Sequence, residues 1–216
     1  MPDFLSTLHK RTSRDYLKRV MEADKADCAE VACKFGQDYW DGDRKYGFGG
    51  YKDDGRWKAV AEQMIGHYGL KAGDSVLDVG CGKSFLLNEM LKLGLRVSGI
   101  DVSSYAVEHA PEPVRPFLKV GTAAKLPYDD RSFDLVISVN TLHNLYVPDL
   151  WSALKEIQRV GRKHRYLVVE AYRNEREKAN LLYWQLTCRA FHTPEEWEWI
   201  YRENGYTGDH SYIYFE

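Results

Sequence analysis

Two glycines and two carboxylates lie at spacings that can hold a nucleoside. Asp78, Gly80 and Gly82 belong to the segment Val-Leu-Asp-Val-Gly-Cys-Gly-Lys-Ser at residues 76–84, and Asp101 comes nineteen positions after Gly82. Glycine permits turn angles that a Cβ would forbid, so the backbone of such a turn can approach a ligand closely. A carboxylate at the position of Asp101 can accept hydrogen bonds from both hydroxyls of a ribose. The spacing therefore predicts a nucleoside site.

The same turn lacks a feature that binds dinucleotides. A dinucleotide fold has a third glycine three positions after the second, which lets helix and strand pack closely around a pyrophosphate. Phe85 occupies that position and would crowd a pyrophosphate. The run from Asp78 to Ser84 instead resembles the first motif of the class I S-adenosylmethionine-dependent methyltransferases, acid-x-Gly-x-Gly-x-Gly, with Ser84 in place of the last glycine. Serine is small and suits the N-terminus of a helix.

This resemblance, which covers roughly residues 57–216, implies S-adenosyl-L-methionine as the cofactor. It implies that the backbone at Gly80 and Gly82, close to Asp78, lines the methionine and ribose portions of that cofactor. Asp101, with Val102 beside it, is then expected to hold the ribose. The alternative for Asp101 is a helix cap, because Val-Ser-Ser follows it.

A second segment resembles the adenine-binding loop of the family. It reads Gly-Thr-Ala-Ala-Lys-Leu-Pro at residues 121–127. Many relatives carry an aspartate before the alanine, whereas here Thr122 precedes Ala123. A hydroxyl accepts a hydrogen bond from the adenine amino group more weakly than a carboxylate does, and an ordinary turn residue is the alternative for Thr122. Asn140, at the end of a predicted strand, is expected near the sulfonium.

Three residues are candidates for catalysis on the molecule that accepts the methyl group. His143 follows a strand signature at residues 133–138, and an imidazole has a pKa suited to proton transfer at neutral pH. The alternative for His143 is a hydrogen bond that orients a helix. Glu170 ends another predicted strand, at the sheet edge where α/β proteins bind ligands. The third candidate, Tyr51, lies in a glycine-rich segment.

That segment, residues 43–57, reads Asp-Arg-Lys-Tyr-Gly-Phe-Gly-Gly-Tyr-Lys-Asp-Asp-Gly-Arg-Trp. It carries phenols, guanidinium groups and carboxylates on a backbone with glycine hinges. Loops of this kind often close over a site and expel water. We expect a lid in which Tyr46, Tyr51 or Arg56 contacts the cofactor carboxylate or the substrate, and a structured surface turn is the alternative.

Strands and helices alternate after the lid, which is typical of a doubly wound α/β sheet with helices on both faces. We expect a mostly parallel, Rossmann-like sheet of six or seven strands, because the resemblance implies a final antiparallel hairpin and the sequence offers one clear last strand. A helical extension over residues 13–35 comes first. The predicted units are an N-terminal helix and lid at 1–56 and a methyltransferase core at 57–216. The predicted strands lie at residues 75–79, 96–100, 117–120, 134–139, 165–170 and 211–215, and the predicted helices at 57–68, 85–93, 104–109, 150–160 and 194–204.

Composition narrows the class of protein. The 216 residues carry a formal net charge of -2, with neither a basic stripe nor an acidic tail, which disfavours a nucleic-acid partner. No long apolar run predicts a membrane span, and no basic-then-apolar leader is apparent. The cysteines form no Cys-x-x-Cys pair, so we expect no metal site and reduced thiols in a cytoplasmic protein. The chain is expected to be a monomer or a homodimer.

These observations predict a methyltransferase that acts on a polar small molecule by in-line methyl transfer. A sugar or sugar-derived metabolite is one candidate acceptor, since the lid beside a small core looks similar to bacterial enzymes of surface-sugar pathways. The alternatives are a regulatory protein that binds the cofactor without catalysis, and a methyltransferase of protein or RNA. The Asn/Asp-Pro-Pro-Tyr/Phe motif for nucleobase and amide acceptors is absent, because residues 139–142 read Val-Asn-Thr-Leu.

Overall fold

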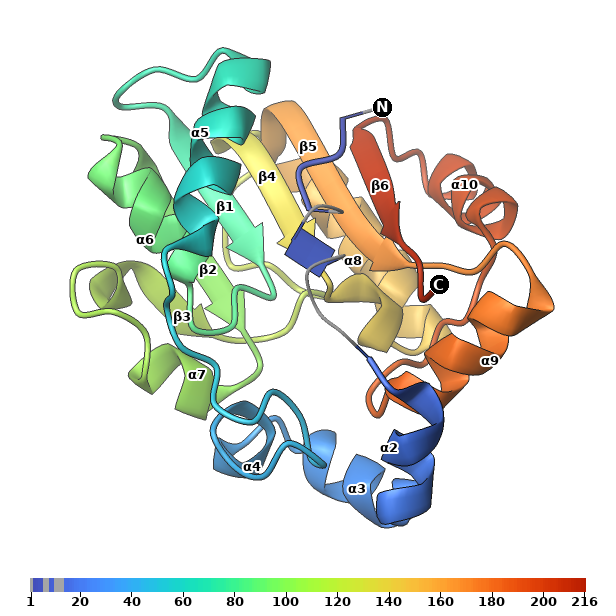
Figure 1. Cartoon of the computed structure of the whole chain (residues 1–216). Helices are drawn as coiled ribbons and strands as arrows, with labels where there is room; N and C mark the ends of the chain where they lie inside the picture. The colour runs from blue at the N-terminus through green and yellow to red at the C-terminus, as the bar shows by residue number, and fades with distance from the viewer. Residues whose placement is uncertain (1, 6–7, 10–13) are drawn as a thin grey trace.

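A six-stranded sheet forms the centre of the molecule (Figure 1). The computed structural model describes residues 2–5, 8–9 and 14–216. The strand order is β3-β2-β1-β4-β5-β6, and every neighbouring pair is parallel. The order reverses next to β1, which places a crevice at the carboxyl ends of the central strands, where open α/β sheets bind ligands. The strands are β1 Ser75–Val79, β2 Arg96–Asp101, β3 Leu118–Val120, β4 Phe133–Val139, β5 Gly161–Glu170 and β6 Asp209–Ile213.

Helices cover both faces of the sheet (Figure 1). Successive side chains of a strand point to opposite faces. Val76 therefore belongs to the buried cluster that includes residues of α5 (Arg56–Tyr68) and α6 (Phe85–Lys92), whereas Leu77 and Val79 belong to the cluster that includes residues of α8 (Val147–Val160) and α10 (Pro194–Glu203). All five residues of β1 are buried, the polar Ser75 and Asp78 included. The helices are α2 Tyr16–Glu22, α3 Lys25–Ala32, α4 Gln37–Trp40, α5 Arg56–Tyr68, α6 Phe85–Lys92, α7 Ser104–Glu108, α8 Val147–Val160, α9 Glu175–Trp184 and α10 Pro194–Glu203, with short 3-10 turns at Arg115–Phe117 and Leu142–Asn144.

The predicted doubly wound fold with six strands is confirmed, and its last strand differs in direction from the family pattern. β6 runs parallel to β5, and the final antiparallel hairpin is not found among the described residues. The helix α10 lies between β5 and β6 in the chain and provides the crossover that a parallel pair requires.

The prediction of one helix over residues 13–35 is wrong in its continuity, and its first residue lies outside the described part of the chain. α2 ends at Glu22 because Ala23 and Asp24 have extended backbone. The Asp24 carboxylate then accepts hydrogen bonds from the N–H groups of Ala26 and Asp27, which starts α3 anew. The helix α9, which packs against α2, was not predicted.

Candidate functional site

The turn after β1 needs glycine at two positions. Gly80 and Gly82 both have left-handed backbone, with φ of 82° and 52°. A Cβ on Gly80 would lie 2.1 Å from the hydroxyl oxygen of Thr141, and a Cβ on Gly82 would lie 2.7 Å from the ring of Trp40. Ser84, which replaces the last glycine of the motif, is also left-handed, with φ of 58°. The turn is therefore tightly enclosed between two other segments.

Asp101 ties the end of β2 to this turn. Its Oδ2 accepts the N–H of Gly82 at 2.7 Å, and its Oδ1 accepts the N–H of Ser103 at 2.8 Å. The cap of α7 is Ser103, whose Oγ accepts the N–H of Ala106. Burial raises the pKa of the Asp101 carboxyl. A carboxylate has about four lone-pair sites, so Asp101 retains capacity to accept ligand hydroxyls.

Asp78 is a buried carboxyl group in need of a donor. Its side chain is 4% exposed, and its Oδ1 has no hydrogen-bond partner among the described residues. Burial, with the charge of Asp101 adding to it, raises the pKa of Asp78 to about 8. A cationic ligand group at this position would supply the missing donor and restore the charged carboxylate. The ammonium group of an amino acid fits that requirement.

These groups face one cavity of about 450 Å³ at the carboxyl ends of the strands. A larger hollow of about 600 Å³ lies at the opposite edge, beside Ser75, Arg96 and Phe133, and contains neither the glycine turn nor Asp101. Most of the predicted site residues line the smaller cavity, namely Tyr51, Arg56, Asp78, Gly80, Gly82, Asp101, Val102, Thr122, Ala123 and Asn140.

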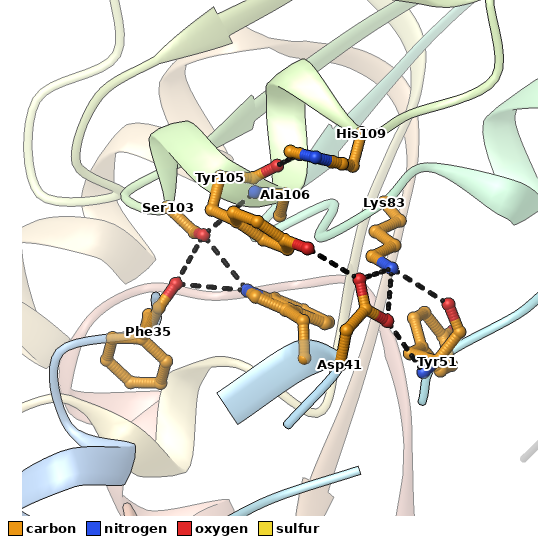
Figure 2. A network of polar contacts seen from close by, with 9 residues as sticks. Phe35, Asp41, Tyr51, Lys83, Ser103, Tyr105, Ala106 and His109 are labelled. Atoms are coloured by element: carbon orange, nitrogen blue, oxygen red, sulfur yellow. Dashed lines mark hydrogen bonds and ion pairs between the residues drawn. The ribbon is translucent and has the colours of Figure 1, made fainter. Parts of the chain in front are cut away.

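An ion pair between buried Lys83 and partly exposed Asp41 fastens the glycine-rich segment to the turn (Figure 2). Lys83, 5% exposed, donates from Nζ to both oxygens of Asp41 at 2.7 and 2.6 Å and to the backbone oxygen of Tyr51 at 3.0 Å. Asp41 also accepts the hydroxyl of Tyr105 and the N–H of Tyr51. Partial burial opposes the charge of Asp41, but the hydrogen bonds from Lys83 and Tyr105 hold its pKa below the ordinary value. Asp41, the glycine turn and α7 are thus joined.

An aromatic cluster covers the glycine turn from the side of the glycine-rich segment. The rings of Trp40 and Phe48 stack with centroids 5.2 Å apart, and Tyr51 bridges from Phe48 to Phe85. The indole N–H of Trp40 donates to the hydroxyl of Ser103 at 2.9 Å. This packing gives a structural reason for the aromatic residues of the glycine-rich segment. Burial raises the pKa of Tyr51, so its hydroxyl stays protonated.

Three predicted residues do not line the cavity, which corrects their expected contact with ligands. Tyr46 packs against the buried cluster of Cys28, Ala32 and Leu186. His143 and Glu170 are buried, with His143 Nε2 3.4 Å from Glu170 Oε2.

His143 is unsuited to act as the general base. Burial lowers its pKa to about 3, and its Nδ1 accepts the backbone N–H of Glu170 at 3.3 Å. Burial also raises the pKa of Glu170 to about 8. The imidazole instead joins the turn at Leu142–Asn144 to the end of β5 through the N–H of Glu170, and the backbone carbonyl of His143 accepts the N–H groups of Arg189 and Ala190.

The cavity extends well beyond the predicted residues. Leu5, His9, Arg14 and Tyr39 line it from before the core, and Ile213 lines it from the end of β6. Because β6 is four strands away from β2, the cavity follows the carboxyl edge of the sheet. No sequence motif marks these residues. Within the described part of the chain, His, Cys, Asp and Glu form no group that could hold a metal, and none of its helices combines the length and apolarity needed to cross a membrane.

Comparisons with known proteins identify the fold and the core. Residues 77–169 match the family described as "Methyltransferase domain". The chain is 32% identical over 111 residues to the 27-O-demethylrifamycin SV methyltransferase of Amycolatopsis mediterranei, a match that covers 48% of this chain and 40% of that relative. It is 32% identical over 98 residues to a demethylmenaquinone methyltransferase of Tropheryma whipplei, covering 44% of this chain and 40% of that relative.

Among solved structures, the YcgJ protein of Bacillus subtilis has the same fold, with a TM-score of 0.56 and 24% identity over 67% of this chain and 66% of that chain. Residues 77–169 thus resemble a methyltransferase domain, and the sheet has the fold of that solved structure. The match of residues 77–169 to the methyltransferase domain family indicates S-adenosyl-L-methionine as the cofactor. The chain covers 40% of the length of each of the two relatives.

Proposed function

We propose that this chain transfers a methyl group from S-adenosyl-L-methionine to a polar small molecule. The observation that carries the proposal is that an oxygen of buried Asp78, in the same cavity as the glycine turn and Asp101, has no hydrogen-bond partner among the residues that the structure describes. When bound, the cofactor supplies a methyl group already activated on a sulfonium. The protein then has to hold an acceptor in line with that methyl group and keep water away.

Each part of the cofactor has proposed partners in this cavity. Asp78 takes the ammonium group, the backbone of the glycine turn approaches the methionine and ribose, and Asp101 beside Val102 holds the ribose. Thr122 and Ala123 contact the adenine, and Asn140 lies toward the sulfonium. Tyr51 and Arg56 lie toward the methionine carboxylate, although the Arg56 guanidinium already pairs with Asp54, with Nε 2.7 Å from Oδ1.

The rest of the cavity suits a small polar acceptor, including one derived from a sugar. The whole cavity, with the cofactor region included, has a volume of about 450 Å³, so only a small acceptor fits beside the cofactor. His9, Tyr39, Asn144 and Asp149 offer donors and acceptors on its wall. His143 and Glu170 lie behind this wall, so neither residue removes a proton from the acceptor. The protein instead orients the acceptor, and the aromatic cluster excludes water.

Several sequence-based predictions belong to the same proposal. Residues 1–56 form the unit of N-terminal helix and glycine-rich lid, and residues 57–216 form the methyltransferase core. The thiols of Cys28, Cys33, Cys81 and Cys188 are unpaired, which supports a reducing, cytoplasmic location. A monomer or homodimer remains the expected assembly.

A labelling experiment tests the acceptor class. Purified protein receives cofactor with a labelled methyl group and, separately, the small-molecule, protein and RNA fractions of a bacterial extract. We expect label in a polar component of the small-molecule fraction. Label confined to protein or RNA would contradict the proposed acceptor, and cofactor binding without transfer to any fraction would favour a regulatory protein.

A further inference from the structure

Three arginines surround one indole ring beside the cavity. The guanidinium carbons of Arg14, Arg19 and Arg44 lie 5.4, 4.7 and 5.1 Å from the ring centroid of Trp184. Arg14 and Arg19 come from the N-terminal segment, Arg44 from the glycine-rich segment and Trp184 from the end of α9. Three segments distant in sequence therefore bring three positive charges together.

The charges of Arg19 and Arg44 are not neutralised within the described part of the chain. Arg19 donates to the carbonyl oxygens of Trp184 at 2.9 Å and Arg44 at 3.3 Å, and Arg44 donates to the carbonyl of Gly47. No carboxylate of the described residues forms an ion pair with either guanidinium. Burial lowers the pKa of Arg14, Arg19 and Arg44, and the charge of Arg44 lowers those of the other two further.

The arrangement of Arg19 and Arg44 is unfavourable unless an anion completes it. Arginine stays charged at neutral pH, so the folded protein holds these two guanidinium groups as partly desolvated cations, and the charge of Arg44 acts against that of Arg19. Cation–π contacts with Trp184 offset part of this repulsion. A doubly charged anion would offset much more of it, because guanidinium groups bind phosphate oxygens with paired, charge-assisted hydrogen bonds.

The cluster joins the cavity through Arg14. Arg14 lines the cavity together with His9, to which it donates from Nη1 to the backbone oxygen at 3.2 Å. Ile213, at the end of β6, lines the same region, whereas Asp101 and Thr122 mark the cofactor region near β2 and β3. Arg19, Arg44 and Trp184 do not line the cavity, so an anion held by the three guanidinium groups would sit beside the end of the cavity that is away from the adenine loop.

We propose that Arg14, Arg19 and Arg44 bind a phosphate or diphosphate group of the methyl acceptor. The acceptor is then a phosphorylated or nucleotide-linked small molecule anchored at Trp184, with its methylated part reaching toward Asn140. This inference rests on the proposed function, because it makes the bound anion part of a methyltransferase substrate.

Calorimetric titration with sodium pyrophosphate tests the site directly. The full chain is saturated with S-adenosylhomocysteine and titrated at constant ionic strength, with sodium chloride as the blank. We expect binding of one pyrophosphate per chain. The variants Arg19→Gln and Arg44→Gln should each bind it about tenfold more weakly. Arg176→Gln, an exposed arginine of α9, serves as the matched control and should bind it like the wild type.

Each outcome decides one part of the inference. Absence of pyrophosphate binding to the wild type, or equal binding by the glutamine variants, would overturn the anion site and leave the three arginines as a clamp on Trp184. If a glutamine variant fails to fold, Arg19→Lys keeps the charge without the planar fork and should bind more weakly than the wild type. S-adenosylhomocysteine affinity, measured in the same samples, reports separately on the proposed function.

Discussion

At the scale of single residues, Gly82 shows why the turn has this sequence. A side chain there must adopt a left-handed backbone and also meet Trp40 at 2.7 Å. Gly69 has a similar φ of 60°, and a Cβ added there would have no neighbour within 4 Å. A substitution at Gly69 therefore reports the free-energy cost of the left-handed backbone alone. We expect Gly69→Ala to lower the free energy of unfolding by about 1 kcal/mol and Gly82→Ala by about 3 kcal/mol. Denaturant unfolding measures both, and equal losses would show that Trp40 does not press on the turn.

The stability of the folded protein depends on pH through Asp78. The pKa of about 8 in the folded chain exceeds the ordinary carboxyl value of about 4. The folded chain therefore keeps a proton that the unfolded chain releases between these pH values. The resulting stability is fully present below about pH 4 and is lost as the pH rises through about 8.

Asp78→Asn should remove this loss. The gain in thermal unfolding temperature of the ligand-free variant over the wild type should be larger at about pH 9 than at about pH 6, because only the wild type loses a proton in that range. The same substitution should weaken S-adenosylhomocysteine binding. Parallel pH profiles for the two proteins would show that Asp78 is not protonated in the ligand-free fold.

At the scale of elements, the Lys83–Asp41 pair fixes the glycine-rich segment over the turn. Replacing one partner of a buried ion pair leaves the other charge uncompensated. Lys83→Met should lower the free energy of unfolding by about 2 kcal/mol, since Asp41 keeps the hydroxyl of Tyr105 and some solvent. The exposed pair of Lys58 and Glu62 provides the control, and Lys58→Met should cost less than about 1 kcal/mol. A loss at Lys83 no larger than at Lys58 would contradict the role of this pair.

The glycine-rich segment should also respond to ligand. Lys52 is exposed and directly follows Tyr51, whose N–H is hydrogen-bonded to Trp40 and Asp41. Trypsin can therefore reach Lys52. If this segment closes over the cofactor, S-adenosylhomocysteine should slow cleavage after Lys52 while cleavage after exposed Arg176 is unchanged. Equal cleavage at Lys52 with and without ligand would exclude closure.

The elements also show what sequence can predict. β1 and the glycine turn are recognisable because their requirements are local: a buried strand, two left-handed positions and an acid at the end of the next strand. The Lys83–Asp41 pair joins residues 42 positions apart and exists only through tertiary packing. The break between α2 and α3 depends on the Asp24 cap, which interrupts an otherwise helical pattern.

At the scale of the whole molecule, the cavity combines a predictable region with an unpredictable one. The residues expected to hold the cofactor follow β1, β2, β3 and β4, whose order is a property of the fold class. The other wall is built from Leu5, His9, Arg14 and Ile213, which the chain brings together only when its two ends meet over the sheet (Figure 1). Nothing in their local sequence marks them. This wall of the cavity therefore depends on tertiary packing and not on a local motif.

Binding of S-adenosylhomocysteine to the wild type and to Asp101→Ala, compared by calorimetry, is the most direct test of the cofactor site. Asp101 is the acid that closes β2 on the turn, and loss of its carboxylate should weaken binding by about 1–3 kcal/mol. Asp129→Ala, at an exposed aspartate outside this cavity, should bind like the wild type. We predict that the wild type binds S-adenosylhomocysteine and that folded Asp101→Ala binds it more weakly by this amount or not at all. A folded wild type that ignores the ligand, or an unchanged affinity in Asp101→Ala, would contradict it.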